Sequence, residues 1–167
     1  MIRNVAREIA MHLSYELSFT DLTASELLDQ RLSSPHFEAL APEYEVYGEL
    51  PNASQRAYIR KLVQGIAVHG YELDQYIEKY AKGWRFERIP LVAGAVMRLC
   101  MYEILYMPEI PNGAAINEAV EISKKYESAE VVRFINGILG SFVRGEVREE
   151  APLPAPPPPA GGEGEDA

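Results

Sequence analysis

Two arginines near the N-terminus have the spacing of a phosphate-binding site. Arg3 and Arg7 are four residues apart and would therefore share one face of a helix, with His12 further along it. Guanidinium groups contact phosphates, and rings stack on bases, so such a face could bind single-stranded RNA. Two arginines near a terminus are also commonly just solvated. The pattern therefore predicts either an RNA contact or a solvated helix face.

A second group of this kind lies towards the other end of the sequence. Tyr126, Arg133 and Phe134 combine two aromatic rings with one guanidinium. Phe134 also falls on the apolar face of the last expected helix, which favours a place in the core over a contact with bases.

Residues that could support catalysis or hold a metal are isolated from one another. The sequence lacks a dinucleotide-binding glycine motif, a P-loop, a zinc-protease motif and a serine-hydrolase elbow. Cys100 lies in the most apolar stretch, where a thiol is usually inert. His12 is four residues from both Glu8 and Glu16, which indicates a charge-balanced surface face rather than a metal site. We therefore expect a helical binding protein without catalysis, metal or cofactor.

The elements that position these residues are expected to be helices, because apolar residues recur at helical spacing and strand patterns are nearly absent. The expected helices span about residues 3–18, 23–35, 52–81, 91–107, 113–126 and 129–145. Capping boxes at Thr23–Glu26 and Asn52–Gln55 mark two of the starts. The stretch 91–107 is apolar on nearly all sides, which is typical of a central core helix. The sequence therefore predicts an all-α fold.

Other segments are expected to connect or pack these helices. Residues 36–51 are predicted to be a looser segment and residues 82–90 a connection. Gly65 and Gly70 lie inside one expected helix, and Asn136-Gly137 inside another. Because glycine costs about 1 kcal/mol in a helix interior relative to alanine, these positions predict close packing, or a bend near His69-Gly70.

Charge is unevenly distributed along the sequence. The net charge is −9, made up of −6 over residues 1–55, +2 over residues 56–145 and −5 over residues 146–167. This balance excludes a protein that coats nucleic acid through bulk charge, but it leaves room for a local basic patch.

The C-terminal residues differ in composition from the rest. Residues 148–167 are rich in proline, glycine, alanine and acids, so they are predicted to form a disordered tail beyond a helical domain of residues 1–147. No apolar stretch approaches the ~18 residues of a membrane-spanning helix. The N-terminus does not resemble a secretory signal, and the single cysteine fits a reducing compartment, so we expect a cytoplasmic protein without a membrane partner.

Three motifs in the second half of the sequence resemble the NusB family of bacterial transcription antitermination factors. They are MRLCMYEI, AINEAVEISKKY and RFINGIL, in that order within residues 88–139. The segment AREIAMHLSYE also resembles the first helix of that family. The resemblance covers roughly residues 3–145 and implies an all-α fold of two packed helical bundles with about seven helices.

The resemblance also implies partners. Family members pair with NusE, a small-subunit ribosomal protein, and the pair binds boxA RNA of nascent ribosomal RNA transcripts. The complex joins RNA polymerase and other Nus factors.

Roles for individual residues follow from the same resemblance. Tyr15 corresponds to a position that faces NusE, and its neighbour Glu16 is assigned to the same partner surface. Glu130 corresponds to an acidic position close to the RNA, where it would repel phosphate. The RNA-binding set is therefore Arg3, Arg7, His12, Tyr126, Glu130, Arg133 and Phe134.

The sequence departs from the family pattern at two places. The family usually opens with a run of arginines, of which only Arg3 and Arg7 remain. Ala93-Gly94 replaces an acidic–basic pair before the central arginine. Each lost phosphate contact lowers RNA affinity, so RNA binding without a partner should be weak.

Two alternatives to an antitermination factor stay open. One is a NusB-like protein-interaction adaptor with little or no RNA binding. The reduced number of N-terminal arginines favours this alternative. The other is kinship with the helical module fused to ribosomal RNA cytosine methyltransferases, which the missing catalytic domain disfavours.

Overall fold

The computed structural model describes residues 1–147, and helices make up most of them. Seven α-helices occur in this part of the chain, which confirms the all-α prediction. They are α1 (Arg3–Leu17), α2 (Ala24–Arg31), α3 (Ser34–Leu40), α4 (Ala53–Tyr80), α5 (Leu91–Tyr106), α6 (Asn112–Ser123) and α7 (Ala129–Glu146). Two short 3₁₀ turns are η1 (Glu45–Tyr47) and η2 (Phe86–Arg88). The predicted disordered tail, residues 148–167, lies outside the described residues.

The helix starts follow the capping residues seen in the sequence. Asn52 and Gln55 form a complete capping box at α4, in which each side chain accepts the other residue's backbone N–H, at 2.9 Å and 2.8 Å. At α2 only half of the predicted box forms, because Thr23 accepts the Glu26 N–H at 3.1 Å without a reciprocal bond.

The prediction of one helix over residues 23–35 is wrong. The chain forms two helices there, and Pro35 lies in the first turn of α3 instead of ending α2. A proline is tolerated in a first turn because the N–H that it lacks has no partner within the helix. The segment predicted as loose therefore contains most of α3 and also η1.

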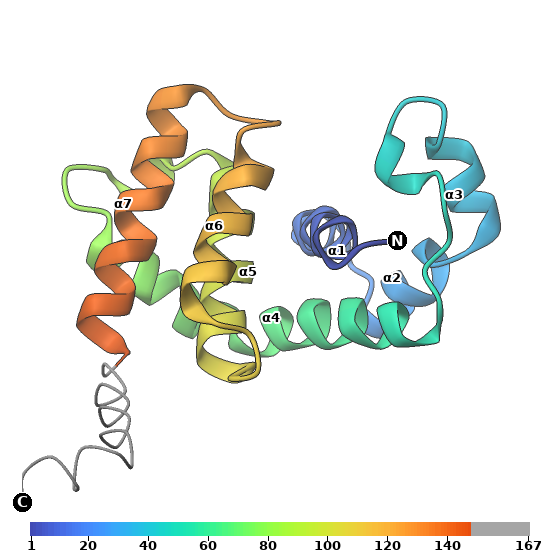
Figure 1. Ribbon diagram of the computed structural model, residues 1–167, viewed down its shortest axis with the longest axis horizontal. Helices are drawn as coiled ribbons and strands as arrows, with labels where there is room; N and C mark the ends of the chain where they lie inside the picture. The colour runs from blue at the N-terminus through green and yellow to red at the C-terminus, as the bar shows by residue number, and fades with distance from the viewer. Residues whose placement is uncertain (148–167) are drawn as a thin grey trace, which may run out of the picture.

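The helices form two bundles joined by α4 (Figure 1). One bundle contains α1, α2, α3 and the start of α4, where Arg60 pairs with Asp29 of α2. The other contains α5, α6, α7 and the end of α4, where Tyr76 packs against Phe142 of α7. Helix α1 contacts both α4 and α5, so it lies on the side of its bundle that faces the other one. With 28 residues, α4 is about 42 Å long, enough to reach across both.

The core is continuous from one bundle to the other. Helix α5 is buried along most of its length, which confirms its predicted central place. Gly65 of α4 lies against it: a Cβ at this position would be 2.1 Å from the Tyr102 ring, so close packing is confirmed there. The prediction of close packing is wrong for Gly70 and Gly137, because a Cβ at either position would have no atom within 4 Å. The predicted bend is absent too, since α4 continues unbroken through His69-Gly70. No helix among residues 1–147 is long and apolar enough to cross a membrane.

Candidate nucleic-acid interface

The two N-terminal arginines have different surroundings. Arg3 is exposed, and its guanidinium lies 5.3 Å from the centroid of the Tyr58 ring. Arg7 is only 3% exposed and donates to both carboxylate oxygens of Glu103 on α5, at 2.6 Å and 2.9 Å. Tyr58 donates a further bond of 3.1 Å to the same carboxylate. The expectation that both arginines are solvated is therefore wrong for Arg7, which forms a buried ion pair.

His12 lies in a hydrogen-bonded network that ties α1 to the α6–α7 connection. Its Nδ1 is 3.0 Å from the Tyr47 hydroxyl, and its Nε2 is 2.6 Å from the Tyr126 hydroxyl. Tyr126 also donates to the buried Glu8 at 2.8 Å, and Lys125 donates to the other oxygen of Glu8 at 2.9 Å. The prediction of a charge-balanced surface face is wrong for Glu8, which is buried and paired with Lys125 and Tyr126.

The network determines which ring nitrogen of a neutral His12 carries the proton. Burial lowers the pKa of His12; the Glu8 carboxylate opposes this effect and the Lys125 ammonium adds to it. Because Tyr126 gives its single proton to Glu8, it accepts the Nε2 proton of a neutral His12, and Nδ1 accepts from Tyr47. His12 thus holds the Tyr126 ring in place and has no free nitrogen of its own.

An aromatic pocket of about 350 Å³ opens beside this network. It is lined by Met11, His12, Tyr15, Leu40, Tyr44, Tyr47, Val92 and Tyr126. The lining joins residues of α1, η1 and the start of α5 to Tyr126, so the pocket lies where the two bundles meet. Its rings and hydroxyl groups could take a flat polar group such as a base.

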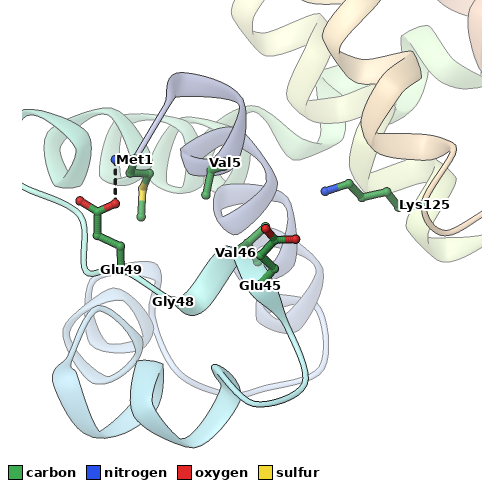
Figure 2. A pocket seen from close by; sticks show the side chains of 7 residues that line it. All are labelled: Met1, Val5, Glu45, Val46, Gly48, Glu49 and Lys125. Carbon is green, nitrogen blue, oxygen red and sulfur yellow. Dashed lines mark hydrogen bonds and ion pairs between the residues drawn. The ribbon is translucent and has the colours of Figure 1, made fainter.

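A neighbouring pocket of about 340 Å³ is less suited to RNA (Figure 2). Glu45 and Glu49 line it, and the Met1 ammonium pairs with Glu49 at 3.0 Å. Lys125 lies on the opposite side, on the other bundle. The only side-chain cation in the lining, Lys125, already pairs with Glu8, so the two carboxylates disfavour a bound phosphate.

The second predicted group lies along α7 and the turn before it. Tyr126 is 37% exposed, and Glu130 and Arg133 are exposed. Phe134 is half-buried, and its ring packs against Trp84 with centroids 4.3 Å apart. The core interpretation of Phe134 is thus partly correct, since one part of the ring faces Trp84 while another stays accessible.

The residues assigned to a protein partner lie at the end of α1. Tyr15 is half-buried, with its ring 5.1 Å from that of Phe19, which is 63% exposed. Glu16 accepts from Nε and Nη2 of Arg31, at 2.8 Å and 2.5 Å. Phe19 was not singled out from the sequence, although a large apolar residue just after an amphipathic helix is a signal that could have identified it.

The second departure from the family pattern has a structural counterpart. Ala93 and Gly94 are buried, and a Cβ at Gly94 would lie 3.4 Å from the Arg98 guanidinium. Arg98 pairs with Asp74 of α4. The arginine therefore lies over the glycine, in place of the usual pair of charges.

Two further observations concern metal binding and thiol chemistry. Residues 1–147 contain no group of three or more His, Cys, Asp or Glu side chains that could hold a metal ion. Cys100 is buried, and burial raises the pKa of its thiol, which keeps it protonated and unreactive.

Comparison with known proteins gives one consistent family. A family model described as the NusB family matches residues 4–144. A transcription antitermination protein NusB from Acetivibrio thermocellus is 38% identical over 144 residues, which cover 86% of this chain and 90% of that protein.

Solved structures give the same likeness in three dimensions. The structure of T. maritima NusB has a TM-score of 0.66 and 25% identity, and the match covers 87% of this chain and 92% of that one. A second match is a chain in the structure of antitermination factors NusB and NusE in complex with double-stranded RNA. It has a TM-score of 0.66 and 24% identity, and the match covers 85% of this chain and 96% of that one. The second match supports the fold.

Proposed function

The chain belongs to the NusB family, and from this premise we propose that it is a transcription antitermination factor. With NusE, a small-subunit ribosomal protein, it binds boxA RNA of nascent ribosomal RNA transcripts and joins RNA polymerase with other Nus factors. It acts in the cytoplasm by binding alone, without catalysis.

The observation that carries this proposal is the extent of the family match. Residues 4–144 include both bundles and, apart from Arg3, both groups of candidate RNA contacts. The network of His12, Tyr126 and Glu8 joins the two groups into one surface. A surface of this kind can follow a single strand with phosphate contacts and ring stacking.

We assign different roles to the candidate RNA contacts. Arg3 and Arg133, both exposed, would bind phosphates. The accessible parts of Tyr126 and Phe134 would stack on bases, and His12 would hold Tyr126 in place. Glu130, exposed in the first turn of α7, would repel phosphate and moderate affinity. For Arg7 we retain only a positioning role, because its guanidinium is occupied by Glu103.

The partner surface is proposed at the end of α1. Tyr15 and the exposed Phe19 offer adjacent rings, and the pair of Glu16 with Arg31 offers a polar edge. Aromatic anchors bordered by polar groups are typical of the energetically important part of a protein interface.

One observation favours the alternative of an adaptor with little RNA binding. With Arg7 buried, Arg3 is the only exposed arginine on α1, so this helix offers one phosphate contact instead of two. The adaptor would still bind NusE through Tyr15 and Phe19. The test therefore has to measure RNA and NusE binding separately.

The test is a titration of a labelled boxA-like RNA and a scrambled RNA of equal length, each with and without NusE, at several salt concentrations. The NusE complex should prefer the boxA-like RNA. Arg3→Ala should reduce the salt slope by about 0.7, the value for one single-strand phosphate. Tyr15→Ala should weaken NusE binding while the helical content stays unchanged.

Two results would count against the proposal. Equal binding of the two RNAs by the complex would remove boxA recognition. Binding of NusE with no measurable RNA binding would establish the adaptor instead.

A further inference from the structure

Three exposed arginines differ from the others in having no partner within residues 1–147. Arg7, Arg31, Arg60 and Arg98 pair with carboxylates, Arg56 donates to backbone carbonyls and Arg144 to Ser141. Arg3 lies over the Tyr58 ring. Neither an ion pair nor a hydrogen bond within the described chain engages the side chains of Arg85, Arg88 and Arg133.

These three arginines are close in sequence to the two members of one aromatic pair. Arg85 and Arg88 are in the connection between α4 and α5, which also carries Trp84. Trp84 packs against Phe134 of α7, the residue next to Arg133. Figure 1 shows this connection running beside α7. Residues distant in sequence thus form one surface.

The connection is shaped to present its side chains. Gly83 has φ of +85°, a conformation that favours glycine and turns the chain just before Trp84. An open hollow of about 660 Å³ follows, lined by Gly83, Trp84, Arg85 and Arg88. Cationic side chains therefore border a half-buried ring.

The charge of this surface is positive although the protein is acidic. Lys82, Arg85, Arg88 and Arg133 are exposed there, against the exposed carboxylates of Glu87 and Glu130. The cations outnumber the acids, whereas the net charge of the whole chain is −9. Local concentration of unpaired guanidinium groups attracts phosphate more than the overall charge suggests.

We propose that Lys82, Arg85, Arg88 and Arg133, with the rings of Trp84 and Phe134, form a second RNA-binding surface, called here the 82–88 surface. It takes single-stranded RNA that continues past Phe134, away from the pocket beside His12. The inference rests on the proposed function, since it extends the RNA path of that function. Its contacts are to phosphates and to the faces of bases, and neither kind of contact requires a particular sequence.

The side chains favour RNA over an acidic protein as the occupant. Guanidinium groups spread along an exposed connection match a chain of regularly spaced phosphates. Continuity with Phe134, already proposed to stack on a base, gives the strand a path onto the surface. A protein interface would instead be expected to offer an exposed apolar centre, and Trp84 and Phe134 are turned largely towards each other.

The test compares a short boxA-like RNA of ~12 nucleotides with the same RNA extended by ~12 nucleotides of arbitrary sequence at either end, all in the presence of NusE. The double variant Arg85→Gln/Arg88→Gln removes two unpaired cations. The matched control, Lys61→Gln/Arg144→Gln, removes two exposed cations from other parts of the surface.

The double variant should bind the RNA extended on one side about three- to tenfold more weakly than the wild type, and its salt slope should fall by about 1.4. It should bind the short RNA with nearly unchanged affinity. The control should change neither value appreciably. Scrambling the extension should leave the result unaltered.

Trp84 gives an independent readout because it is the only tryptophan in the chain. In protein grown with fluorotryptophan and mixed with unlabelled NusE, its fluorine NMR signal should shift with the extended RNA and less with the short one. Contact at the 82–88 surface is thereby observed directly.

The possible failures are distinguishable. If the wild-type complex binds no RNA, the proposed function and the second surface both fall. If it prefers boxA-like RNA but the double variant behaves like the control and the Trp84 signal does not shift, only the second surface falls. If the variant loses NusE binding and keeps RNA binding, the surface belongs to a protein interface and the inference is overturned.

Discussion

A single buried carboxylate determines which arginine of α1 is exposed to solvent and which is part of the core. Arg3 and Arg7 are the same residue type four positions apart, yet one is exposed and the other is 3% exposed. The difference comes from Glu103, which approaches Arg7 from α5 and is itself fully buried. A buried carboxylate is stable only when paired, so Arg7 serves the core.

We predict that Arg7→Ala lowers the free energy of unfolding by about 3–5 kcal/mol, because it leaves Glu103 buried without its cation. Arg3→Ala should change it by no more than about 0.5 kcal/mol, as for most exposed positions. Urea unfolding followed by circular dichroism measures both. Equal effects of the two substitutions would show that the ion pair adds nothing.

The sequence contained only a partial signal for this pair. Glu103 stands out as one of two charges in an otherwise apolar helix, and such a charge requires a buried partner. Nothing in the sequence identifies Arg7 as that partner, since the two are 96 residues apart. The link from His12 to Tyr126 was hidden for the same reason.

His12 should make stability depend on pH. Because burial lowers its pKa below the ordinary value of about 6.5, the unfolded chain binds this proton more readily than the folded one. The associated stability is present above about pH 6.5 and is lost as the pH falls through the lower folded pKa. His12→Gln should therefore reduce the loss of stability between about pH 6.5 and 5.

Thermal unfolding across that pH range provides the measurement. His36 shifts in the same direction through burial and Arg31, so His36→Gln is the comparison that separates the two contributions. An identical pH profile for His12→Gln and the wild type would mean that His12 titrates alike in both states.

Among the helices, those with strong apolar periodicity were the most predictable. The long α4 was anticipated closely because its apolar residues recur at helical spacing over many turns. The buried α5 was anticipated for another reason, because its sequence is apolar on nearly all sides. The short α3 was missed for two reasons. Its seven residues are too few to show a helical pattern, and Pro35 was taken as the end of the preceding helix because proline usually breaks helices. The basic connection around Trp84 was treated only as a linker, and its packing on α7 depends on tertiary structure.

Two glycines of α4 offer a matched test of helix packing. Gly65→Ala should destabilise the protein by about 1–3 kcal/mol, because the new Cβ would collide with the Tyr102 ring and push α4 and α5 apart. Gly70→Ala meets nothing within 4 Å and should be neutral or stabilise by up to about 1 kcal/mol. Chemical unfolding of the two variants decides, and a stabilising Gly65→Ala would contradict the close approach.

Taken together, the two bundles form one structural unit. Helix α4 belongs to both, and α1 packs on α4 and α5. The two-bundle arrangement was expected from the family resemblance and not from periodicity, because periodicity identifies helices without saying which of them touch. A shared core predicts that the bundles unfold together.

Leu99→Ala tests whether the two bundles unfold together, because Leu99 lies in the middle of α5 and is only 2% exposed. Removing its side chain should cost about 2–5 kcal/mol. Circular dichroism, which reports all helices, and the fluorescence of Trp84, which lies in one bundle, should give the same unfolding midpoint. Separate midpoints would show that the bundles unfold independently.

The pairing of Arg7 with Glu103 also has a consequence for biosynthesis. A ribosome adding about 5–20 residues per second needs roughly 5–20 s to travel the 96 residues from the first partner to the second. During most of that interval α4 is incomplete, because it ends at Tyr80, and α5 is complete only after Glu103 has been added, so the apolar face of α1 lacks its full cover. The nascent chain therefore passes through a window in which its first helix is open to chaperones, and this window closes only when the middle of the polypeptide has emerged.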